Sequence, residues 1–146
     1  MIDFEVLPHT ADIKIRVYGK TQQELFRHAL IGMFQVIRPM IPECKIEHDR
    51  IVCATLPEEH EIRIEACDKE SLLVDFLSEA LYLSDVNNEA YLDVIIYECT
   101  DSFLHATLCG VKIEGFEVVE IKAVTYHELM IKKEHDIWQA DIVFDI

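Results

Sequence analysis

Apolar and polar residues alternate in two stretches at opposite ends of the chain, strictly in the first. In residues 12–18 every second residue from Ile13 onward is apolar, and Asp12 begins the opposite, polar face. In residues 141–146 the even positions are apolar, and Asp145 belongs to the polar face. This period of two is that of a half-buried β-strand. The sequence therefore predicts an amphipathic strand near each end of the chain.

Two other stretches repeat their apolar residues every three or four positions, as an amphipathic helix does. Thr21 and Glu24 have the spacing of a capping box, which predicts that the first helix begins after Thr21. Pro39 then ends it. The second helix is expected over residues 69–84, with Asp68 at its N-cap.

The rest of the chain is predicted to be mostly strand. Further strands are expected at residues 4–7, 46–56, 61–66, 91–99, 103–111 and 118–127, and the last strand is expected over residues 137–146. Two helices among many strands predict an α+β fold in which both helices cover one side of a mostly antiparallel, mixed sheet. With 146 residues and no repeat or linker, a single domain over residues 1–146 is expected.

The charge balance limits the partners that this chain can bind. It contains 13 Lys and Arg against 28 Asp and Glu, a net charge of −15. This acidity argues against autonomous nucleic-acid binding, which needs a basic surface, and favours solubility, a cation or a basic protein partner. No apolar run reaches the ~18–20 residues of a membrane span, and no signal peptide is visible, so we expect a soluble cytoplasmic protein.

The cysteine pattern predicts free thiols. The five cysteines are Cys44, Cys53, Cys67, Cys99 and Cys109. Their number is odd, and neither a Cys-x-x-Cys motif nor a zinc-ligand spacing with histidine occurs. We expect no structural disulfide and no zinc site, in a reducing compartment.

Motifs of covalent or phosphate chemistry are missing. There is no Gly-x-Ser-x-Gly, and four glycines are too few for a glycine-rich phosphate loop. The seven histidines are scattered, and each is interpreted first as a packed or solvated residue. His9 and His127 remain secondary candidates, because either could act as a general base beside a metal ion.

Carboxylates supply the main candidate site. If the strands that carry Asp12 and Asp145 are neighbours, both side chains meet the α-carboxylate of Ile146, and a cation would relieve their repulsion. Hard oxygen donors select calcium, magnesium or manganese, and calcium tolerates the looser geometry. The alternative is that Asp12 caps a turn and Asp145 is a solvated end residue. Lys122, in an apolar run, is either a solvated strand residue or a positive group that faces a phosphate or an acidic site of a partner.

Four short elements together resemble the archease family. They are His9-Thr10-Ala11-Asp12, the helix over residues 21–37, the stretch from Ile121 to His127, and the C-terminal Val143-Phe144-Asp145-Ile146. They occur in the family's order and at its length, and jointly they are specific. Pro8 stands where many members carry an acidic residue.

The resemblance implies an accessory factor of the tRNA-splicing RNA ligase, which joins a 2′,3′-cyclic phosphate to a 5′-hydroxyl. Archeases promote guanylylation of the ligase's active-site histidine and so allow multiple turnover; the GTP and the manganese belong to the ligase. The family's essential residues match Asp12, Lys122 and Asp145. Its calcium site matches Asp12, Asp145 and Ile146. An acidic factor also suits a basic RNA-binding enzyme.

Three functional hypotheses follow. The first is a binding module that activates the ligase without chemistry of its own. The second is a stand-alone metal-dependent hydrolase built on the same carboxylates. The third is a chaperone-like protein that uses only its shape and acidity. Substrate turnover by the isolated protein separates the second hypothesis from the others, and metal dependence of ligase activation separates the first from the third.

Overall fold

The computed structural model describes residues 2–8, 12–117, 120–126 and 129–146, which form two helices and ten strands. The helices are α1 (Gln22–Ile37) and α2 (Lys69–Asn87). The strands are β1 (Phe4–Leu7), β2 (Ile13–Gly19), β3 (Lys45–Glu47), β4 (Arg50–Val52), β5 (Glu58–Glu65), β6 (Glu89–Cys99), β7 (Phe103–Lys112), β8 (Ala123–Thr125), β9 (Ile131–Glu134) and β10 (Ile137–Asp145). The α+β class predicted from the sequence is confirmed.

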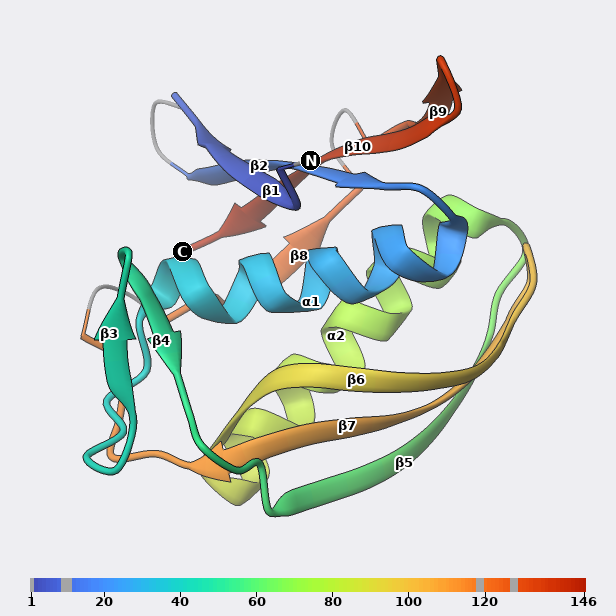
Figure 1. Ribbon diagram of the computed structural model, residues 1–146. Helices are drawn as coiled ribbons and strands as arrows, with labels where there is room; N and C mark the ends of the chain where they lie inside the picture. The colour runs from blue at the N-terminus through green and yellow to red at the C-terminus, as the bar shows by residue number, and fades with distance from the viewer. Residues whose placement is uncertain (1, 9–11, 118–119, 127–128) are drawn as a thin grey trace.

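Both helices lie between two antiparallel sheets (Figure 1). One sheet has the strand order β1-β2-β10-β8, with β9 also paired to β10, and the other has the order β5-β7-β6. The sequence predicted one mixed sheet with both helices on a single side, and this arrangement of layers is wrong. Every pairing between described strands is antiparallel. Apolar periodicity gives the buried face of a strand, whereas the choice of partner strand depends on residues far away in the sequence.

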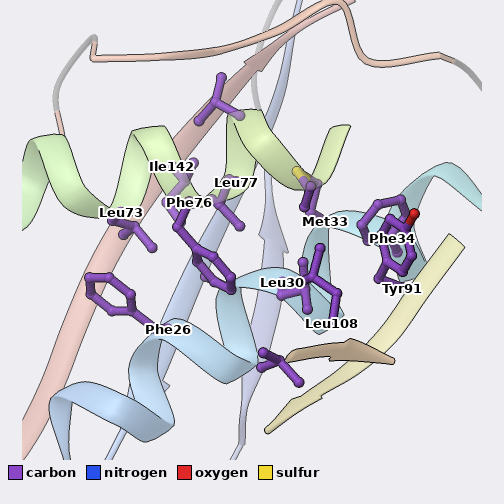
Figure 2. Close-up of a cluster of buried hydrophobic side chains, with 14 of the residues drawn as sticks. Phe26, Leu30, Met33, Phe34, Leu73, Phe76, Leu77, Tyr91, Leu108 and Ile142 are labelled. Carbon is purple, nitrogen blue, oxygen red and sulfur yellow. The ribbon is translucent and has the colours of Figure 1, made fainter. Parts of the chain in front are cut away.

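The space between the sheets is filled by one connected core (Figure 2). Phe26 of α1 stacks on Phe76 of α2 with ring centroids 5.9 Å apart. Phe34 of α1 meets Tyr91 of β6 edge-to-face at 5.7 Å. From the other sheet, Ile142 is fully buried in the same cluster. Burial against both sheets stabilises the helices and fixes how the two sheets lie relative to each other.

The predicted helix starts are present. The Thr21 hydroxyl accepts a hydrogen bond from the backbone N–H of Glu24, and Asp68 caps α2 in the same way. The Glu24 carboxylate reaches back to the N–H of Lys20, one residue before the cap. Within the described chain, neither helix is both long and apolar enough to cross a membrane.

One prediction about the cysteines is wrong. Cys44 and Cys53 form a disulfide, with Cα atoms 4.5 Å apart, whereas Cys67, Cys99 and Cys109 are free. A single strand was expected over residues 46–56, but His48 and Asp49 adopt left-handed backbone conformations, with φ of 51° and 63°. They form the two-residue turn of the β3–β4 hairpin, which brings the flanking cysteines opposite each other. An odd cysteine count does not exclude such a local pair.

Candidate functional site

The C-terminal end of β10 brings three distant parts of the sequence together. Phe144 pairs with Ile13 of β2, and one more residue in this register puts Asp145 opposite Asp12. On the other side of β10, Asp145 pairs with Ala123 of β8. The backbone N–H of Lys122 donates a hydrogen bond to the Asp145 carbonyl over 2.7 Å. The first and last parts of the chain are therefore neighbours here, as the carboxylate hypothesis requires.

An ion pair on the same two strands supports this register. Arg16 of β2 lies opposite Asp141 of β10, and its guanidinium donates two hydrogen bonds to that carboxylate, at 2.7 and 3.0 Å. The guanidinium holds the pKa of Asp141 below its usual 3.8, and the carboxylate raises the pKa of Arg16. This bidentate contact fixes the alignment of β2 with β10 four residues away from Asp12 along the chain.

Strand alternation separates the candidate residues onto two faces of this sheet. Ile15 and Ile142 are fully buried on the face that meets the helices, whereas Arg16 and Asp141 lie on the outward face. Asp12 and Asp145 continue the outward row, because each lies an even number of residues from Arg16 or Asp141 on its own strand. The two carboxylates therefore share one face at the sheet end, with Asp145 exposed and Asp12 partly exposed.

Lys122 lies toward the helices instead. It is exposed, and it lines a pocket of about 460 Å³ between α2, the end of α1, Phe116 and residues 120–123. Continuing the β8–β10 register by one residue puts Lys122 opposite Ile146. The structure therefore brings the lysine and the carboxylates to the same end of the sheet, but onto opposite faces of it.

The pocket beside Lys122 combines an apolar lining with charged residues. Its apolar residues include Ile37, Leu81, Phe116 and Ile121, and its polar ones include Ser78, Tyr82, Asp85 and Glu120. The sequence placed Lys122 in an apolar run but did not indicate that residues of α2, such as Ser78 and Asp85, would lie beside it.

The oxygen donors fit a hard divalent cation only with help from the main chain. Asp12 and Asp145 supply two carboxylates, and no group of three or more His, Cys, Asp or Glu side chains in a metal-holding arrangement occurs among the described residues. The third anionic group would be the α-carboxylate of Ile146, whose residue is 38% exposed. Calcium takes such oxygen ligands together with water or backbone carbonyls, so this donor set is compatible with it.

His9 and His127 lie outside the described residues, as do Thr10 and Ala11 of the N-terminal motif. The site is therefore built from Asp12, Lys122, Asp145 and Ile146.

Comparison with known proteins gives a consistent family assignment. Residues 4–146 match the family model of the Archease protein family. The protein archease of Methanosarcina barkeri is 42% identical over 151 residues, which cover 98% of this chain and 95% of the relative. That of Thermococcus kodakarensis is 36% identical over 154 residues and covers all of both chains.

Solved structures agree with this assignment. The solution structure of Methanobacterium thermoautotrophicum protein 1598 has a TM-score of 0.71 to this chain, at 30% identity and 99% coverage of each. A crystal structure of an archease described as a possible chaperone, from Thermotoga maritima, has a TM-score of 0.62 at 23% identity over 96% of this chain and 94% of that one, which supports the fold. This chain belongs to the archease family.

Proposed function

We propose that this protein is an accessory factor of the tRNA-splicing RNA ligase. It promotes guanylylation of the active-site histidine of the ligase and thereby enables multiple turnover in tRNA splicing and RNA repair. GTP and manganese are bound by the ligase, and this protein contributes no covalent chemistry of its own.

The single observation that carries the proposal is the convergence of Asp12, Lys122 and Asp145 at the end of β10. These are the residues that the family resemblance marks for activation, and they come from three separate stretches of the sequence. Two carboxylates and an exposed ammonium at one sheet end can engage charged groups of a partner's active site. The net charge of −15 supports docking onto a basic RNA-binding enzyme.

We also propose that Asp12, Asp145 and the α-carboxylate of Ile146 hold a calcium ion. The ion would compensate their mutual repulsion and connect β2 to the chain end. Its chemical contribution would be electrostatic, since calcium has no redox chemistry at such a site. The two side chains lie on the outward face, away from the pocket that Lys122 lines, so the calcium site and Lys122 are separately testable.

The decisive experiment is multiple-turnover RNA ligation by the purified ligase with GTP and manganese, with and without this protein. Transfer of labelled GMP to the ligase is measured in parallel. We expect that this protein, at substoichiometric amounts, increases both GMP transfer and the number of turnovers. Asp145→Asn should abolish most of this effect, and Asp101→Asn, an exposed turn residue, is the matched control.

Two outcomes would contradict the proposal. The first is that GMP transfer to the ligase is the same with and without this protein. The second is that the isolated protein hydrolyses a phosphodiester in a metal-dependent way, which would favour the hydrolase hypothesis.

A further inference from the structure

The three-stranded sheet has an outward face that no part of the proposed function uses. Alternation directs Ile62, Ala106 and Leu108 toward the helices, where they are buried. The residues between them, including Glu61 and Thr107, lie on the other face. Figure 1 shows this sheet on the far side of α1 from β10, so the face is remote from the end of β10.

An exposed aromatic ring is held in place on this face. The hydroxyl group of Tyr97 is hydrogen-bonded to that of Thr107 at 2.9 Å, and its ring packs against the ring of His105, tilted by 46°, with centroids 4.8 Å apart. The Nε2 atom of His105 is in turn 2.9 Å from the Glu61 carboxylate. Nevertheless, Tyr97 is 54% exposed. These contacts hold the Tyr97 side chain in one position. A ligand that stacks on the exposed part of the ring therefore costs little additional side-chain entropy.

Several carboxylates lie on the same face of the sheet as this ring. Glu59, Glu61 and Glu65 lie on the outward side of β5 and are exposed. On the opposite edge, Glu98 pairs with His105 across the ladder and is also exposed. We call the surface formed by these four glutamates, Tyr97, His105 and Thr107 the Tyr97 face.

The basic residues near the Tyr97 face do not neutralise it. Arg63 is an exposed residue of β5 that pairs with His105 and so lies on the same face, where it offsets one of the four glutamate charges. Arg27 of α1 is engaged with Asp93 of β6 at 2.7 Å, so that pair carries no net charge. The face keeps a negative charge, to which an aromatic surface is added.

We propose that the Tyr97 face binds an arginine-rich segment of a partner protein. A guanidinium group stacks on a tyrosine ring and donates paired hydrogen bonds to carboxylates, and an ammonium group lacks this planar geometry. A nucleic acid would also stack on Tyr97, but its phosphates would be repelled by the glutamates. Charge complementarity therefore selects a basic polypeptide.

The probe is a synthetic nine-residue peptide that alternates arginine and glycine. Backbone amide NMR shifts of the isotope-labelled protein are followed during titration, and affinity is measured at low and at high salt. The same peptide with citrulline in place of arginine keeps the shape but loses the charge. A single-stranded oligouridine of similar length tests the nucleic-acid alternative.

Two pairs of matched variants locate the binding site. Glu59→Gln with Glu65→Gln removes two charges from the Tyr97 face, and Glu43→Gln with Glu47→Gln removes two exposed charges elsewhere. Tyr97→Leu removes the ring, and Tyr82→Leu removes a tyrosine of similar exposure, 61%, on α2. Thermal melts check that every variant is folded.

We expect saturable shifts confined to β5, β6 and β7, with an affinity that falls as salt rises. Tyr97→Leu should weaken binding about two- to fivefold, and the Glu59/Glu65 pair should weaken it by at least as much. Tyr82→Leu and the Glu43/Glu47 pair should change it less than about twofold.

Three outcomes would each overturn the proposal. The first is that both glutamate pairs weaken binding equally, and the second is that the citrulline peptide binds as well as the arginine peptide. The third is that oligouridine binds and the arginine peptide does not.

Discussion

The hydroxyl of Tyr91 donates a 2.7 Å hydrogen bond to the carboxylate of Glu89, whose side chain is only 1% exposed. The Nε2 atom of His60 lies 2.6 Å from the same oxygen, and the ammonium group of Lys112 is 3.0 Å from the other. A buried carboxylate is thereby connected to β5, β6 and β7 at once. Burial alone would raise the pKa of Glu89, but these hydrogen bonds outweigh it and lower that pKa to about 2.

Glu89→Gln is expected to reduce the free energy of unfolding by about 1–3 kcal/mol at neutral pH, because a buried ionic hydrogen-bond network loses its charge. The pKa of Glu89 is lower in the folded than in the unfolded chain, so its stabilisation is complete above about pH 4.5 and is lost as the pH falls toward about 2. The difference between parent and variant should shrink over that range. Urea unfolding at a series of pH values measures it, and Glu65→Gln, an exposed position, should change stability by less than about 0.5 kcal/mol.

The disulfide is expected to stabilise the β3–β4 hairpin. Cys44 and Cys53 are nine positions apart, and closing a loop of this size contributes about 2–3 kcal/mol. Cys53→Ser should lower the free energy of unfolding by that amount, whereas Cys67→Ser, at an exposed free thiol, should change it little. Thiol titration of the unfolded chain without reductant should find three free thiols, and five would contradict the pairing.

Calcium is expected to raise the thermal stability of this protein. Binding at Asp12, Asp145 and the α-carboxylate of Ile146 would connect β2 to the end of β10, and a ligand that binds only the folded state stabilises it. Asp12→Asn and Asp145→Asn should each weaken calcium binding. An extension beyond Ile146 should do the same, because it moves the terminal carboxylate away. Calorimetric titration and melting with and without calcium measure these effects.

The control for the calcium site removes one negative charge at a position outside the site. Asp101→Asn, in the turn between β6 and β7, should bind calcium as the parent does. Absence of calcium heat and of stabilisation at millimolar calcium in the parent would contradict the assignment, as would parental affinity in the extended variant.

Lys122→Ala should leave the fold intact and reduce ligase activation. The side chain is exposed, so its loss should change the free energy of unfolding by less than about 0.5 kcal/mol. Loss of a charge that contacts the partner should reduce the activation rate at least about tenfold at limiting concentrations. Lys122→Arg should keep part of the activity, and Lys20→Ala, at an exposed residue before α1, should keep all of it. An unchanged rate for Lys122→Ala would exclude this role.

Local signals in the sequence determined most of the elements. The alternation around Ile15 predicted β2 and its buried face, and the capping residues Thr21 and Asp68 predicted the starts of both helices. Asn88, with a left-handed φ of 54°, ends α2 a few residues beyond the end at residue 84 that the sequence predicted. These features depend on residues within a few positions of one another, and so their physical causes can be read along the chain.

Strand pairing was decided only in the tertiary structure. The pairing of β10 with both β2 and β8 brings Asp145 next to Asp12 and Lys122, although more than a hundred residues separate the two aspartates in the sequence. The same register places Lys122 on the opposite side of the sheet from the carboxylates, which no local pattern could indicate. The period of two in the sequence identifies the two faces of each strand. The partner of a strand and its alignment depend instead on how α1 and α2 pack between the two sheets, because that packing adds up many contacts between residues distant in the sequence.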